Sequence, residues 1–171
     1  NVFANESFMV ELAKAAGKDP YAYRMSLLDG KPRFANVLKL AAEKAGWGKP
    51  LPKGHAHGIA LMEGYGTYMA QVAEVSLGDQ GEVKVHRVTV AADLGHMVNP
   101  DTVEAQIQSS IIFGMGAVLK HQVTMTNGRV QQTNYDNFQP VRMFEAPKID
   151  IVLVPSTEAP GDRKSTRLNS S

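Results

Sequence analysis

The stretch "EVKVHRVTVAADLGHMVNPDTVEAQIQSSIIFGMGAVL", residues 82–119, decides the fold of this chain. Its first part is rich in β-branched residues, and after Val88 both faces are apolar, which is typical of a strand that runs into the buried part of a sheet. A long apolar segment follows the dipeptide "NP", and its residues on one helical face are Val103, Ile107, Ile111, Gly114 and Val118. The stretch therefore predicts a strand that leads through a loop into a buried helix.

Amphipathic helices are expected before this stretch. Apolar residues recur at helical spacing up to Gly17, then between Asp19 and Gly30, and again from Phe34 to Gly46. Asp19 precedes a proline and is expected to cap the second helix, whereas the glycines are typical residues just after a helix end. The residues up to Gly46 therefore predict a helical layer.

Strands are expected on both sides of the buried helix. Residues 58–77 and 82–93 are rich in β-branched and aromatic residues, and the sequence "GDQG" between them fits a hairpin. Asn127 and Gly128 fit the type I′ turn of a second hairpin, and residues 148–156 predict one more strand. We therefore expect an α+β fold in which an N-terminal helical layer is followed by hairpin strands packed on the buried helix.

The composition indicates one soluble globular domain. The 171 residues are 43% hydrophobic and carry a net charge of +1, which argues against a disordered chain and against a nucleic-acid binder. The chain has no cysteine, so it provides no disulfide, thiolate nucleophile or iron–sulfur ligand, and cytoplasm and periplasm both stay open. Residues 162–171 have no core-forming pattern and are expected to be an appended or disordered tail outside a domain of residues 1–161.

The predicted buried helix carries the polar and small residues of most interest. Asp101, with Glu104 three residues later, fits a capping box, so Asp101 is expected to be the N-cap. Gln106 has apolar neighbours in the sequence and is expected to be substantially buried, where its amide needs hydrogen-bond partners. Gly114 and Gly116 lie within the helix, so they are expected to let another backbone approach closely rather than to bind a phosphate.

The histidines are candidate metal ligands. His55 and His57 are two residues apart, which would put both on one face of a strand and, with a third histidine, could bind a metal. Lys53 and Gly54 instead favour a loop with solvated histidines. The acidic residues are scattered, so the residues alone predict no metal site and no complete catalytic constellation.

Four stretches together resemble the closing part of the molybdenum-binding large subunit of the xanthine dehydrogenase and aldehyde oxidase family, in particular the branch of the isoquinoline 1-oxidoreductase beta chains. They are residues 1–30, 58–77, 85–119 and 127–161. The resemblance implies that residues 1–161 form a C-terminal portion of a larger molybdenum-cofactor-binding domain.

The resemblance also implies one cofactor contact. In the family, the segment that matches "NPDTVEAQIQSS" has a glutamine that hydrogen-bonds the pterin of the cofactor, and the matching residue is Gln106. The chain departs from the family at Gln108, Ser109 and Ser110, where Glu-Gly-Gly is usual. Only Gln106 is therefore carried over as a cofactor-binding residue.

The implied reaction is oxidative hydroxylation of an N-heterocycle or an aldehyde, with water as the source of oxygen. The implied cofactor is molybdenum–molybdopterin in its cytosine dinucleotide form. Electrons would pass to iron–sulfur clusters in a small partner subunit and then to a cytochrome or another acceptor. The general-base glutamate of the family follows the position of Gly161, where this chain has "DRKSTRLNSS", so no catalytic residue is assigned and residues 1–161 alone are expected to be inactive.

Two other functions stay open from the sequence. One is a non-catalytic domain that keeps the fold and serves as an interaction surface for an iron–sulfur partner. The other is a hydrolase that uses the pair His55 and His57.

Overall fold

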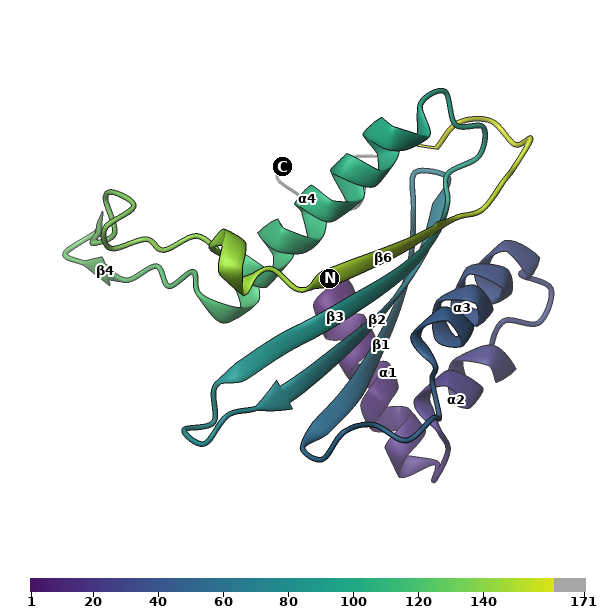
Figure 1. The fold of residues 1–171 in the computed structure, drawn as a ribbon, viewed down its shortest axis with the longest axis horizontal. Helices are drawn as coiled ribbons and strands as arrows, with labels where there is room; N and C mark the ends of the chain where they lie inside the picture. The colour runs from purple at the N-terminus through teal and green to yellow at the C-terminus, as the bar shows by residue number, and fades with distance from the viewer. Residues whose placement is uncertain (162–171) are drawn as a thin grey trace.

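The computed structural model of the protein describes residues 1–161. Its helices are α1 (Val2–Ala15), α2 (Pro20–Ser26), α3 (Pro32–Ala45) and α4 (Pro100–Leu119), with a short 3₁₀ helix η1 (Met143–Glu145). Its strands are β1 (His55–Gly64), β2 (Thr67–Leu77), β3 (Val83–Asp93), β4 (Met125–Thr126), β5 (Arg129–Val130) and β6 (Lys148–Leu153). Figure 1 shows α2 and α3 on one side of the main sheet and α4 on the other. The predicted α+β architecture is confirmed.

The main sheet has the strand order β1-β2-β3-β6. β1, β2 and β3 form an antiparallel meander, whereas β6 pairs with β3 in parallel. Parallel neighbours cannot be joined by a tight turn, and the connection from β3 to β6 contains α4 and the β4–β5 hairpin. The sequence predicted β6 as a strand but not its parallel partner.

Each face of the sheet has its own apolar core. On the α3 face, the buried residues are Val37, Leu38, Ala41, Ala42, Ile59, Ala70, Val72 and Ala91. On the α4 face, they are Met69, Val88, Val90, Ala92, Leu94, Val103, Ile107 and Ile111. The predicted buried face of α4 is therefore confirmed at Val103, Ile107 and Ile111. It is wrong at Val118, which is 67% exposed, and Gly114 is only partly buried. Each large aliphatic side chain removed from water stabilises the fold by about 1.5 to 3 kcal/mol.

A buried arginine attaches α1 and α2 to the free edge of the sheet. Arg24 is 2% exposed, and its guanidinium donates to the carboxylate and the main-chain oxygen of Glu6. The same Glu6 carboxylate accepts from the backbone N–H of Leu61 in the edge strand β1, at 2.7 Å. Because an edge strand presents unpaired backbone groups, this contact both satisfies one of them and places α1 along β1.

Several predicted boundaries change in the structure. Residues 58–77 form parts of two strands, because Tyr65 and Gly66 both have positive φ angles and make the turn between β1 and β2. The hairpin at Asn127 and Gly128 is confirmed, with φ angles of 50° and 74°. The predicted N-cap Asp101 is wrong. Asn99 caps α4, since its extended backbone suits the residue before a proline and its side chain accepts from the N–H of Thr102.

The carboxyl ends of β3 and β6 continue side by side as two loops. The backbone N–H of His96 donates to the oxygen of Glu158, and the N–H of Gly161 donates to the oxygen of Leu94, at 2.9 and 2.7 Å. Gly95 lies between these bonds with a φ angle of 75°, and a Cβ atom there would overlap the carbonyl oxygen of Ala159. The close approach of the two loops therefore requires glycine at position 95.

An ion pair holds the same end of the sheet to α3. Arg33 donates to both carboxylate oxygens of Asp93, at 2.8 and 2.7 Å, and its guanidinium carbon lies 4.4 Å from the centre of the Tyr68 ring. The Asp93 carboxylate also accepts from the N–H of Gly95. These hydrogen bonds, with that from Arg33 as the main cause, lower the pKa of Asp93 below its ordinary value.

Among residues 1–161, no helix is both long enough and apolar enough to span a bilayer. The prediction that residues 162–171 form a tail outside the domain concerns residues beyond the described part of the chain, and it stays a prediction.

Replacing Gly95 by alanine tests the loop contact. Alanine at a positive φ angle costs about 1 to 2 kcal/mol, and the overlap with Ala159 adds to that cost because backbone atoms must move. Gly17→Ala is the matched control, because Gly17 has a φ angle of 63° but open space around its Cβ position. Urea unfolding should show a larger loss for Gly95→Ala than for Gly17→Ala; equal losses would contradict the close contact.

Asp93→Asn tests the ion pair through its pH dependence. Because the pKa of Asp93 is lower in the folded protein, the pair stabilises the fold above the unfolded-state pKa, and this is lost as pH falls through the folded pKa. Asp93→Asn should lower the free energy of unfolding by about 2 kcal/mol at neutral pH and by less near pH 3. Asp79→Asn, which removes an exposed carboxylate, should change it little at either pH. A deficit for Asp93→Asn that is the same at both pH values would contradict the role of the charge.

Candidate functional site

The candidate site lies where β3 and β6 end and α4 begins. In open sheets with parallel strands, ligands bind in the crevice beyond the carboxyl ends of those strands. In this protein, the carboxyl ends of β3 and β6 are followed by the loop 94–99, the segment 154–161 and the first turns of α4 (Figure 1). The ion pair of Arg33 and Asp93 fixes the start of the loop.

The first turns of α4 present an exposed row of polar side chains. Thr102, Gln106 and Ser109 lie at helical spacing on the side of α4 that does not face the sheet, and all are exposed. Phe113, which is 60% exposed, continues this row by one turn. The row therefore offers hydroxyl and amide groups, with an aromatic ring at its end.

Gln106 is exposed, so the prediction of a substantially buried amide is wrong. The buried side of α4 is formed by Val103, Ile107 and Ile111, and Gln106 falls beside that side rather than within it. Its amide makes no hydrogen bond with any of residues 1–161. Both its N–H donors and its oxygen acceptor are therefore available to a ligand that has donors and acceptors along one edge.

Gly161 packs at the same end of the sheet. A Cβ atom on Gly161 would lie 2.6 Å from the Thr67 hydroxyl and 2.8 Å from the backbone of Gly66. The backbone of Gly161 is thus held between Leu94 and the β1–β2 turn. Glu158 is exposed, and its main-chain oxygen accepts from His96. Glu158 contributes structure through its backbone, and its carboxylate adds, after that of Asp93, to the negative charge that raises the pKa of Arg33.

The prediction that Gly114 and Gly116 let another backbone approach α4 closely is wrong for both glycines. Gly116 is buried, and a Cβ atom there would lie 2.8 Å from the imidazole of His121. A Cβ atom on Gly114 would have no atom of residues 1–161 within 4 Å. The close approach at Gly116 therefore involves a side chain and not a backbone, and Gly114 faces open space.

The histidine pair lies in strand β1 and not in a loop, because residues 55 and 57 pair with β2. Nδ1 of His55 lies 2.7 Å from the carboxylate of Glu74, and the ring of His55 stacks on His86 at 4.3 Å between centroids. His57 stacks on Trp47, and partial burial lowers its pKa. These partners are structural, and they lie at the end of the sheet opposite to Asp93.

Metal ligation has no support in this geometry. Within residues 1–161, no three histidine, aspartate or glutamate side chains are placed so that they could hold a metal ion.

The sequence reasoning missed Arg33 and Asp93. Asp93 had a recognisable signal, because it is a lone carboxylate at the end of the apolar run "VTVAAD". Arg33 had none, since it lies at the start of an ordinary amphipathic helix and the two residues are 60 positions apart.

The comparisons with known proteins agree with one family. The family model described as a molybdopterin cofactor-binding domain matches residues 10–147. The chain is 31% identical over 161 residues to the beta chain of isoquinoline 1-oxidoreductase from Brevundimonas diminuta, covering 92% of this chain and 21% of that protein. It is 34% identical to one of the subunits of nicotinate dehydrogenase from Pseudomonas putida, covering 94% of this chain and 15% of that protein.

A membrane-bound aldehyde dehydrogenase from Gluconacetobacter polyoxogenes is 32% identical over 91% of this chain and 23% of its own length. The chain thus spans less than a quarter of each of these relatives.

Two solved structures share the fold. The quinoline 2-oxidoreductase of Pseudomonas putida 86 matches with a TM-score of 0.55 and 21% identity, over 58% of this chain and 14% of that one. A Cu,Mo-CO dehydrogenase matches with a TM-score of 0.54 and 18% identity, over the same shares. With the family match over most of the chain, these findings show that the protein belongs to the molybdopterin cofactor-binding domain family.

Proposed function

We propose that this chain is part of the large subunit of a molybdenum-dependent oxidoreductase that hydroxylates an N-heterocycle or an aldehyde. The family match supports the cofactor class, and the relatives' names include an isoquinoline oxidoreductase, a nicotinate dehydrogenase and an aldehyde dehydrogenase. The described residues would provide one wall of the cofactor site. Residues 1–161 alone are expected to be inactive, because they contain no assigned general base.

The exposed row of polar side chains on α4 has the hydrogen-bonding groups that a pterin would need. A pterin is a heteroaromatic ring system that has hydrogen-bond donors and acceptors along its edges, and the row offers an amide at Gln106 and hydroxyls at Thr102 and Ser109. The single observation that carries the proposal is the amide of Gln106, which is exposed in the second turn of α4 and has no partner among the described residues.

The molybdenum cofactor, when bound, would supply the redox chemistry, and this chain's residues would bind and orient it. Gln106 would donate to and accept from the pterin edge, which fixes the orientation of the ring. The ion pair of Arg33 and Asp93 would hold the loop that starts α4, so that Gln106 is presented from a rigid helix. The backbone of Gly161 would fix the point from which the general-base segment of the family continues.

The partners and the cofactor form complete the proposal. The names of two relatives describe them as single subunits of larger enzymes. This chain contains no cysteine, the usual ligand of iron–sulfur clusters. We therefore assign these clusters to a small partner subunit. A cytochrome or another acceptor would take the electrons onward. The cofactor is proposed to be the cytosine dinucleotide form.

Gln106→Ala in the full-length subunit, purified with its partner, should lower molybdenum and pterin content. Losing hydrogen bonds to one polar edge costs about 1 to 3 kcal/mol, which corresponds to about 5- to 150-fold weaker retention of the cofactor. Metal analysis and nucleotide analysis of the purified protein measure this. The fold should be unaffected, because Gln106 is exposed.

Gln108→Ala is the matched control, because Gln108 is an exposed glutamine on the same helix on the other side of its buried face. It should retain the cofactor at the level of the unchanged subunit. Full cofactor content and turnover in Gln106→Ala would overturn the assignment of Gln106. Equal losses in both variants would attribute the effect to the helix as a whole.

A further inference from the structure

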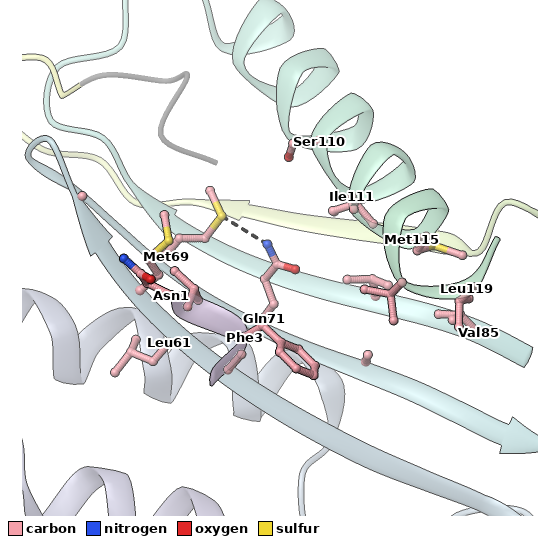
Figure 2. Close-up of a pocket in the computed structure, with 18 of the residues that line it drawn as sticks. Asn1, Phe3, Leu61, Met69, Gln71, Val85, Ser110, Ile111, Met115 and Leu119 are labelled. Atoms are coloured by element: carbon pink, nitrogen blue, oxygen red, sulfur yellow. Dashed lines mark hydrogen bonds between the residues drawn. The ribbon is translucent and has the colours of Figure 1, made fainter. Parts of the chain in front are cut away.

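A large apolar groove lies beside α4, on the half of the sheet that this helix does not cover. Its volume is about 590 Å³. Its floor is formed by β1, β2 and the first half of β3, and its two walls are the C-terminal half of α4 and the first turn of α1 (Figure 2).

The floor of the groove is mostly apolar along β2. Met69, Gln71, Ala73 and Val75 are successive residues on one face of β2, and all line the groove. Gln71 is the polar exception: in Figure 2 its amide points into the groove. Its nitrogen donates only a weak hydrogen bond to the sulfur of Met69, at 3.4 Å.

The walls of the groove are open and apolar. On α4, Gly114 lines the groove and no atom of the described residues lies within 4 Å of its Cβ position, and Val118 is 67% exposed. On α1, the ring of Phe3 lines the opposite wall and is 72% exposed. Among the described residues that line the groove, Glu63 is the one with a charged side chain. Contiguous exposed apolar surface that is rimmed by polar residues is typical of protein interfaces and of ligand-binding grooves.

The groove is continuous with the core of the domain. Met69, Val88 and Ile111 belong to the buried core under α4 and also line the groove. A core that opens directly into a groove indicates that further chain completes the same layer. Such chain exists in the relatives, since at least three quarters of each lies outside the part that matches this chain.

We propose that another segment of the same large subunit, outside these residues, packs into this groove and completes the α4-side layer of the sheet. The segment is apolar where it meets Ala73 and Val75, and it presents one polar group, such as a backbone carbonyl, to the amide of Gln71. Gly114 leaves room for it beside α4. This inference rests on the proposal that the chain is part of a large subunit and not on the role of Gln106, so the two are tested independently.

Photo-crosslinking in the full-length subunit, assembled with its partner, identifies the occupant. The photoreactive residue p-benzoylphenylalanine replaces Phe3 in one protein and Val118 in another, so that the two opposite walls are probed. The photoreactive residue keeps the phenyl ring of Phe3 and adds a benzoyl group, and Phe3 is exposed enough among residues 1–161 to accept the larger side chain. Mass spectrometry of the crosslinked peptides should identify the same segment of the large subunit from both positions.

The control places the same photoreactive residue at Phe144, which is exposed and does not line the groove. It should not crosslink to the segment that Phe3 and Val118 share. Crosslinks from the groove to a partner subunit or to a second copy would overturn the proposal. A crosslinking yield no higher than that of the control would also overturn the proposal, because the groove would then hold only solvent or a small apolar molecule.

A second measurement does not depend on crosslinking. Gly114→Trp fills open space in residues 1–161 but would displace the proposed segment, whereas Gly114→Ala adds one methyl group and improves helix propensity. In the full-length subunit, Gly114→Trp should lower the melting temperature by several degrees relative to Gly114→Ala. Cofactor analysis of the two variants separates this effect from loss of cofactor. Equal melting temperatures would overturn the proposal.

Discussion

The parallel pairing of β3 with β6 is the constraint on which the rest of the structure depends. Because parallel neighbours need a long connection, the chain between them must cross the sheet, and α4 does so on one face. The carboxyl ends of both strands then lie together, and α4 starts there. The backbone bonds of His96 to Glu158 and of Gly161 to Leu94 extend this pairing beyond the strands. The candidate site is a direct consequence of this connection.

Charge and glycine geometry keep that end of the sheet rigid. Asp93 is nearly buried, so its carboxylate requires strong partners, which Arg33 and the N–H of Gly95 provide. Gly95 allows the two loops to meet, because any side chain there would overlap Ala159. A ligand that binds across α4 and the neighbouring loops would thus meet a surface whose geometry is set before binding, which reduces the entropy lost on association.

The sequence predicted the features that local periodicity and turn chemistry encode. The buried face of α4 followed from the spacing of Val103, Ile107 and Ile111, and the second hairpin followed from Asn127 and Gly128. What it could not predict depends on contacts between distant segments. The exposure of Gln106 depends on which layers cover α4, and sequence neighbours do not report that. The partnership of Arg33 and Asp93 spans 60 residues and leaves no local pattern.

The uneven covering of α4 connects the site to the groove. The N-terminal half of this helix packs on the sheet through Val103 and Ile107 and presents Gln106 outward, whereas Gly114 and Val118 in its C-terminal half face the open groove. A helix that is packed at one end keeps the residues near that end fixed, but its other end is restrained only by the few side chains that contact it. Filling the groove would therefore stiffen the whole of α4, so that the segment completing the layer also restrains the helix from which Gln106 projects.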